Sequence, residues 1–125
     1  MADWRSIPRA PDSAKDRLVL GWTDWTTLTV TGASWSAASG NPPQYCIDTM
    51  GFVHLRGAVT TATAPNPNTV LTLPTGVRPA VDSRWLLSSS GLALIHLSIP
   101  VNGQVSMLVA TATTVDLSPV TFFRG

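Results

Sequence analysis

The sequence predicts an all-β protein: an antiparallel β-sandwich or jelly-roll head over residues 21–125, preceded by an extended N-terminal arm over residues 1–20. The chain has 125 residues, the size of one domain, but it contains no Glu and a single Lys. Because these two residues usually cover exposed helix surfaces, their scarcity indicates that helices are few. Thr and Val, which favour strands, are abundant, and short apolar runs are separated by Gly, Pro and Asn.

Charge and proline set the arm apart from the rest of the chain. Seven of the fifteen charged residues, eight basic and seven acidic in all, lie within residues 1–17. Pro8 and Pro11 prevent a regular helix there, and the segment shows no strand-like alternation. We expect the arm to become ordered on a partner molecule. Two apolar and two basic side chains are its candidate partner-binding residues: Trp4, Ile7, Arg5 and Arg9.

Three strands are expected in the first half of the head. Residues 26–30 alternate and end at Thr31-Gly32, and residues 44–48 follow a loop rich in Gly and Pro. Residues 52–60 form the clearest strand of this half, because their alternate positions divide into two distinct faces. One face is Val53, Leu55 and Val59, and the other is Phe52, His54, Arg56 and Ala58.

The second half contains short strands divided by strong turn signals. Asn102-Gly103 lies between two alternating apolar segments, and this dipeptide suits the positive φ angles of a type I′ turn, so we expect a tight hairpin there. Residues 64–68 form a loop by composition, and residues 74–76 end the strand before them. The strands expected in this half are residues 70–73, 83–88, 92–99, 104–110, 114–117 and 120–123.

The chain beyond the first 17 residues is poor in charge, which predicts that part of its outer surface is covered. These 108 residues carry the other eight charges. Obligate oligomer interfaces are a common reason for such a composition, so we expect a homo-oligomer. The alternative is a monomeric β-domain kept soluble by Ser and Thr hydroxyls.

Composition also excludes several classes of partner. The formal net charge is +1 and no basic stripe is present, so no nucleic-acid partner is expected. The longest apolar region, residues 85–101, is interrupted by Ser, His and Pro, so no membrane partner is expected. The N-terminal sequence has no apolar run after its basic residues and does not match a secretory signal, which predicts assembly in a cytoplasm.

No set of side chains suited to catalysis or metal binding emerges, so we expect neither an enzyme nor a cofactor. His54 and His96 lie in strands without Cys, Asp or Glu at the usual ligand spacings. They are expected to be structural or interface residues, and the alternative is a ring of histidines around a symmetry axis. Cys46 has no base committed to it and is expected to be buried.

Tryptophan offers a surface chemistry that composition leaves open, because aromatic faces stack on saccharides. Core and interface positions are commoner for this residue, so saccharide binding is the alternative hypothesis. The five tryptophans are Trp4, Trp22, Trp25, Trp35 and Trp85.

Several short motifs follow one another at characteristic spacing. They are WTTLTVTG from Trp25, GFVHLRG from Gly51 and LTLPTGVRP from Leu71, followed by the Asn102-Gly103 hairpin and VDLSPVTF from Val115. This order resembles the C-terminal head domain of bacteriophage tail fibres, receptor-binding proteins and related surface proteins. The resemblance covers about residues 22–123.

The resemblance implies a trimeric β head, exposed on the exterior of a virion and without catalytic activity. Among the matching residues, Gly57 would relieve crowding where a strand bends, and Leu73 would lie in the core. Residues 74–76 would shape a turn. Arg78 would hold loop carbonyls or a carboxylate such as that of Asp82.

Tail fibres usually carry a long shaft before such a head, whereas the arm is short. The leading hypothesis is therefore a non-enzymatic phage structural protein, a trimeric capsid decoration or minor capsid protein anchored by its arm. The alternative is a receptor-binding or tail-fibre tip protein that recognises a host-surface saccharide. Expected partners are two further copies of the chain, major capsid or tail proteins and, for the alternative, a host-surface glycan. Assembly is expected in the host cytoplasm.

Overall fold

The computed structural model describes residues 21–62, 68–89, 94–109 and 112–125, and every regular element within them is a β-strand. The prediction of an all-β fold is therefore confirmed. The arm, with Trp4, Arg5, Ile7 and Arg9, lies outside the described residues. The strands are β1 (Thr26–Thr27), β2 (Trp35–Ala37), β3 (Gln44–Ile47), β4 (Phe52–Arg56), β5 (Ala58–Thr61), β6 (Asn68–Thr72), β7 (Ser83–Ser88), β8 (Leu94–Ile99), β9 (Gln104–Leu108), β10 (Thr113–Asp116) and β11 (Thr121–Phe123).

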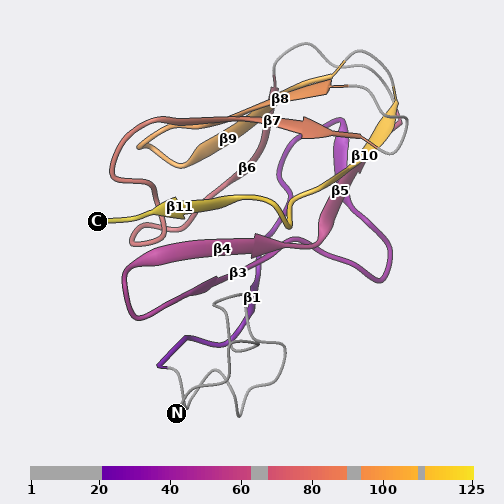
Figure 1. Ribbon diagram of the computed structural model, residues 1–125. Helices are drawn as coiled ribbons and strands as arrows, with labels where there is room; N and C mark the ends of the chain where they lie inside the picture. Colours follow the sequence, from indigo (N-terminus) through magenta and orange to yellow (C-terminus); the bar gives the residue numbers. More distant parts are fainter. Residues whose placement is uncertain (1–20, 63–67, 90–93, 110–111) are drawn as a thin grey trace.

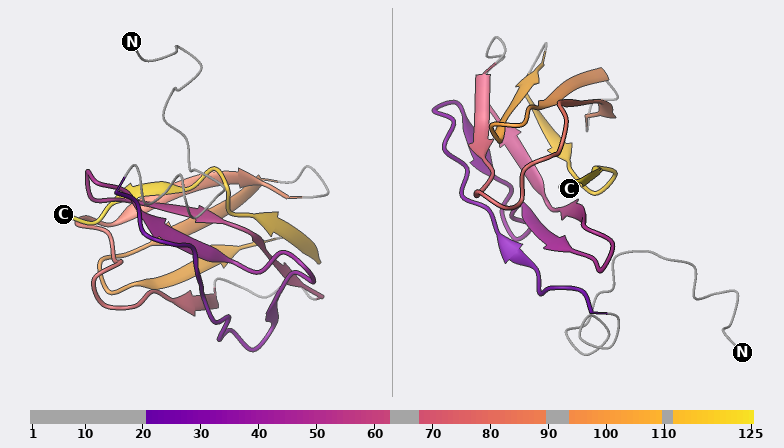
Figure 2. Two further views of the ribbon diagram at one scale, coloured as in Figure 1. Left: turned by 90° about the horizontal axis from the view of Figure 1, so that it is seen from below. Right: turned by 90° about the vertical axis from the view of Figure 1, so that its left-hand side faces the viewer.

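The described strands pair antiparallel in three sheets, ordered β1-β3-β4-β11, β10-β5-β2 and β6-β9-β8-β7. The first two sheets share one layer, because β5 continues β4 and β11 follows β10 after a short loop. Figure 1 shows the β6-β9-β8-β7 sheet above β1, β3, β4 and β11, with β5 and β10 rising beside it, and Figure 2 shows the fold from two further directions. The head is a two-layered β-sandwich.

Backbone bridges join the two layers at their edges. Val30, after β1, bridges Leu71 of β6, and Ser89, after β7, bridges Val115 of β10. The core lies between the layers and includes Leu73, whose predicted burial is confirmed. Burying one large apolar side chain stabilises a fold by about 1.5–3 kcal/mol. The large side chains buried most completely are Leu71, Leu73, Ile95, Leu97, Ile99, Met107 and Leu117.

The strand expected at residues 52–60 is divided at Gly57 into β4 and β5, which belong to different sheets. Gly57 has a φ of +89°, and a Cβ at this position would collide with the carbonyl oxygen of Pro42. The carbonyl of Gly57 accepts a hydrogen bond from the amide of Leu117 at 2.9 Å. Because glycine alone combines this backbone with so close an approach, the strand bends here, as the resemblance implied. The single continuous strand expected over residues 52–60 is wrong.

The β8–β9 hairpin is confirmed, but the predicted type I′ turn is wrong. The amide of Gly103 donates to the carbonyl of Pro100 at 2.9 Å, so the turn begins one residue earlier than a turn centred on Asn102-Gly103 would. Leu97 pairs with Met107, and both side chains are buried. That register requires a loop with an odd number of residues, and Gly103, with a φ of +81°, ends it in the left-handed conformation.

The loop before β7 packs against this turn. Nε of Arg78 donates to the carbonyl of Leu73 at 3.0 Å, which confirms the expected role of Arg78 in holding a loop carbonyl. Asp82 instead accepts a hydrogen bond from the amide of Val101 at 2.8 Å. A Cβ on Gly103 would lie 2.7 Å from Nε of Arg78, so the arginine also limits what the turn can contain.

Candidate functional site

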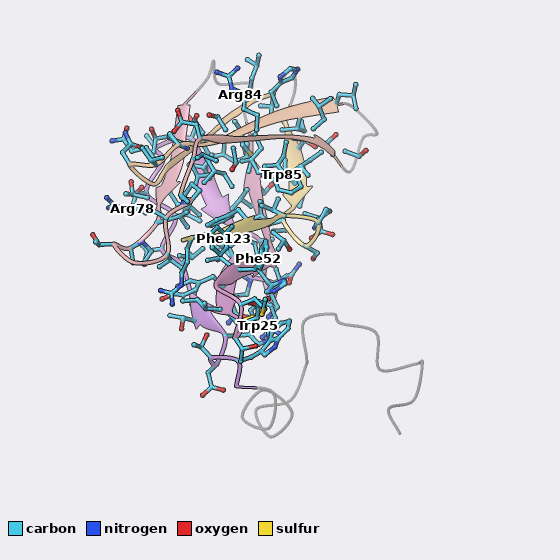
Figure 3. All side chains as sticks on the ribbon, turned by 60° about the vertical axis from the view of Figure 1, so that its left-hand side comes forward. Trp25, Phe52, Arg78, Arg84, Trp85 and Phe123 are labelled. Atoms are coloured by element: carbon cyan, nitrogen blue, oxygen red, sulfur yellow. The ribbon has the colours of Figure 1, made fainter. Side chains whose placement is uncertain are left out.

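The outer face of the β1-β3-β4-β11 sheet gathers aromatic and polar side chains. The register places Gln44 opposite Arg56 and Cys46 opposite His54, so these positions point to the same side of the sheet. The residues between them in β4 point into the core. We use the name aromatic face for five side chains on this side of the sheet, namely Trp22, Trp25, Gln44, His54 and Arg56. Trp25 is labelled in Figure 3.

His54 is held from three directions. Trp22 stacks on its imidazole, with ring centroids 4.6 Å apart and an interplanar angle of 15°. Nε2 of His54 lies 2.9 Å from Oδ2 of Asp48, and Nδ1 lies 3.2 Å from Oγ1 of Thr121. The segment before β1, the β3–β4 connection and strand β11 therefore fix this ring.

Asp48 supplies the negative charge of this network. Partial burial favours the neutral carboxyl and raises the pKa of Asp48, but hydrogen bonds with His54 and with the amides of Phe52 and Met50 lower it more. The pKa consequently lies below its ordinary value of 3.8. The carboxylate is charged at neutral pH, and it holds both the β3–β4 connection and the imidazole.

Arg56 is oriented by two neighbours. Its guanidinium carbon lies 4.1 Å from the centroid of the Trp25 ring, a cation–π contact. Nε donates to Oε1 of Gln44 at 2.7 Å, and Nε2 of Gln44 donates to Oγ1 of Thr27 at 3.1 Å. The two terminal nitrogens of Arg56 make no hydrogen bond with any residue that the structure describes. The contacts with Trp25 and Gln44 orient the guanidinium, whose two terminal nitrogens carry four N–H donors.

The other tryptophans have different positions. Trp35 is buried in the core, and Trp85 packs against the core and is partly buried. Their indole nitrogens have no hydrogen-bond partner among the described residues. Trp4 lies outside those residues. Of the five tryptophans considered for saccharide binding, Trp22 and Trp25 therefore remain as candidates on the surface of the head.

The outer face of the β6-β9-β8-β7 sheet is different in character. Three leucines there, Leu86, Leu94 and Leu108, are 62%, 68% and 44% exposed, and we call them the leucine ridge. Beside the ridge, Ser98 lies opposite Ser106 across β8 and β9. These small residues form the floor of a depression of about 220 Å³, which we call the serine hollow.

The structure separates the two histidines. His54 lies on the outer face of one layer and His96 on the outer face of the other, so they cannot both line one symmetry axis. The described residues contain no group of three or more His, Cys, Asp or Glu side chains that could hold a metal ion. Cys46 is buried, as expected. Nothing in the described part of the chain forms a helix able to cross a membrane.

Sequence reasoning found part of the aromatic face and missed the rest. It placed His54 and Arg56 together on one strand face, because alternation alone is enough for that. It did not connect His54 with Asp48 or Thr121, since Thr121 lies 67 residues away and only the pairing of β11 with β4 brings it close. The sequence carries no local signal for that contact.

Comparisons with known proteins identify a similar fold. No family model matches the sequence, and no curated protein matches it. Among solved structures, the chain is similar to the receptor-binding protein gp15 of Listeria phage PSA, with a TM-score of 0.70 and 16% sequence identity. The alignment covers 90% of this chain and 70% of that one. At this identity the similarity establishes a shared β architecture.

Proposed function

We propose that this chain is the receptor-binding-type head of a phage virion surface protein and that its aromatic face recognises a saccharide on the host surface. The observation that carries this proposal is the aromatic face itself, where Trp22 and the terminal N–H groups of Arg56 are held in fixed orientations. The fold shared with a phage receptor-binding protein supports a position on the virion exterior.

The arrangement suits saccharide chemistry. One face of the Trp22 indole rests on His54, and the ring is only partly buried, so it offers a flat apolar surface to a sugar ring. Arg56 supplies several hydrogen-bond donors to hydroxyl or acidic groups of the same ligand. Because both side chains are already fixed by protein contacts, little conformational entropy is lost when the ligand binds.

This proposal favours the receptor-binding hypothesis over capsid decoration. The similar solved structure is named a receptor-binding protein, and the aromatic face gives this chain a surface for such a role. Recognition by such a surface needs no catalysis, so we propose a binding protein and not an enzyme. Attachment to capsid or tail proteins through Trp4, Arg5, Ile7 and Arg9 remains a prediction for residues outside those described.

Binding of the purified full chain to an array of bacterial surface polysaccharides tests the proposal. Trp22→Ala should abolish retention on the polysaccharide that the wild type binds, because the flat stacking surface is lost, whereas Trp22→Phe should keep part of it. Val81→Ala is the matched control, since Val81 is 70% exposed and lies outside the aromatic face. Equal retention of Trp22→Ala and the wild type would contradict the proposal, as would the absence of any bound polysaccharide.

A further inference from the structure

The serine hollow lies where three strands bring polar side chains into one cross-strand row. Arg84 of β7 pairs with Ser98 of β8, and Ser98 pairs with Ser106 of β9, so the three side chains project from the same face of the sheet. His96 occupies the next outward position along β8 and also lines the hollow. The register therefore gathers a guanidinium, two hydroxyls and an imidazole around one depression of about 220 Å³.

The protein does not use the hydrogen-bonding capacity of these four side chains. No hydrogen bond or ion pair joins any of them to another residue in the part of the chain that the structure describes. Arg84 and His96 are exposed, and the two serines are partly buried. The hollow is thus lined by polar groups that are accessible to a ligand and lack a partner among the described residues.

The charge at the hollow is positive and unopposed. Among the described side chains of β6, β7, β8 and β9, Arg84 alone carries a permanent charge. Asp82, two residues before Arg84, lies in the loop that precedes β7, where its carboxylate accepts a hydrogen bond from the amide of Val101 at 2.8 Å. A guanidinium without a carboxylate partner attracts an anion, so charge complementarity favours a negatively charged ligand.

The arrangement of the donors favours a phosphate over a carboxylate group. A guanidinium pairs with either group through two parallel hydrogen bonds. Here, however, further donors lie on β8 and β9, so the ligand needs acceptor oxygens that point in several directions. The tetrahedral oxygens of a phosphate do so, whereas the two oxygens of a carboxylate lie in one plane with their carbon.

The dimensions of the hollow suit a small group. Its volume of about 220 Å³ lies below the roughly 300–1,000 Å³ of pockets that enclose a drug-sized ligand. The backbone of Leu97 and Met107 contributes to the floor, because their side chains point into the core. Leu108, which is 44% exposed, stands at the side. A phosphate group can therefore lie against the serines while a short organic substituent contacts Leu108.

We propose that the serine hollow binds a phosphate group, with the guanidinium of Arg84 as its charged anchor and the hydroxyls of Ser98 and Ser106 as orienting donors. His96 supplies a further N–H donor at the edge of the site. Inorganic phosphate and the phosphate end of an ester present the same kind of oxygens to these side chains, so both sources are included in the test.

The phosphate site is separate from the aromatic face. Figure 3 shows Trp25 and Arg84 toward opposite ends of the head, one on each layer. A phosphate in the hollow therefore leaves the aromatic face accessible. The proposal goes beyond saccharide recognition and does not depend on it, so the two can fail independently.

NMR titration of the nitrogen-labelled full chain in a phosphate-free buffer tests the proposal. Inorganic phosphate and methyl phosphate should each shift the amide signals of residues 84, 96–98 and 106–108, and the shifts should saturate in the millimolar range. Trimethyl phosphate, which is tetrahedral but uncharged, should leave these signals in place. A lower Kd for methyl phosphate would identify an ester as the better occupant, and an equal or lower Kd for inorganic phosphate would identify the free anion.

Substitutions assign the binding to the hollow. Arg84→Gln should raise the Kd by about tenfold or more, because it removes both the charge and the paired donors, and Arg84→Lys should raise it less because the charge remains. The double variant Ser98→Ala, Ser106→Ala should also weaken binding. Arg124→Gln is the matched control, because it removes the same charge from an exposed residue that follows β11 in the other layer, and it should leave the Kd unchanged.

The same spectra monitor the fold and contain the results that would overturn the proposal. The substituted side chains of β7, β8 and β9 point away from the core, so signals outside the hollow should stay in place, and the serine double variant keeps the test decisive if Arg84→Gln does not fold. Shifts that do not saturate overturn the proposal, as do shifts that Arg84→Gln and Arg124→Gln reduce equally. Tighter binding of acetate than of either phosphate overturns the choice of ligand.

Discussion

Two glycines with left-handed backbones differ in what surrounds them, which separates conformational strain from collision. Gly40, with a φ of +73°, has nothing within 4 Å of an added Cβ, whereas at Gly57 the Cβ would strike the carbonyl oxygen of Pro42. Gly40→Ala should therefore cost about 1–2 kcal/mol of unfolding free energy, the usual cost of this conformation. Gly57→Ala should cost clearly more. Urea denaturation of both variants measures the difference, and equal losses would show that the contact with Pro42 imposes no constraint.

Asp48 gives the head a dependence on acid. Its pKa in the folded protein lies below 3.8, so its contribution to stability is fully present above that value and is lost as the pH falls through the folded pKa. Asp48→Asn should lower the free energy of unfolding by about 1–3 kcal/mol at pH 7, because the hydrogen bonds lose their charge. The difference between wild type and variant should shrink below pH 3.8.

Thermal melts between pH 2.5 and pH 7 provide this measurement. Asp116→Asn is the matched control, because Asp116 also accepts hydrogen bonds locally, from the amide and hydroxyl of Ser118, but is exposed. Its effect should be small throughout the range. A penalty for Asp48→Asn that is as large at pH 2.5 as at pH 7 would mean that its carboxylate charge is not what stabilises the β3–β4 connection.

At the scale of the element, the β8–β9 hairpin shows how core packing determines a turn. Deleting Val101 would shorten the loop to the length that a type I′ turn requires, but it would place buried side chains of one strand opposite outward side chains of the other. We expect the deletion to cost more than the roughly 2–5 kcal/mol of one truncated core side chain. Val101→Ala keeps the loop length at a residue that is 51% exposed and should cost under about 0.5 kcal/mol. Chemical denaturation of both variants compares the costs, and similar values would refute the role of loop length.

The same hairpin shows what sequence reasoning could and could not reach. The apolar alternation of residues 95–99 and 105–109 correctly predicted two paired strands, and it also contained the register, because the buried positions are odd-numbered in both. Odd positions can lie opposite odd positions only across an odd loop. The Asn102-Gly103 signal was given more weight than this alternation, and the turn type was therefore wrong.

The elements of the aromatic face were less accessible from the sequence. The division of residues 52–60 into β4 and β5 depends on the approach of Pro42 to Gly57, a contact that no pattern within the strand announces. Likewise, no local pattern announced that the register would align the exposed side chains of Leu86 and Leu108 on either side of His96. That the charge-poor surface is covered stays a prediction.

At the scale of the whole molecule, the pairing of strands from distant parts of the chain determines when the head can form. β5 pairs with β10, and a hydrogen bond across this pair joins two residues that are 53 positions apart in the sequence. β4 pairs with β11, and a side-chain contact across this pair joins two residues that are 67 positions apart. Such non-local topologies fold slowly, in milliseconds to seconds, because long loops must close before the contacts form. During synthesis, one edge of β4 stays unpaired until residues 121–123 have left the ribosome. A chain truncated before β11 would expose that edge to pairing with other chains, so folding of this head is completed only after its synthesis.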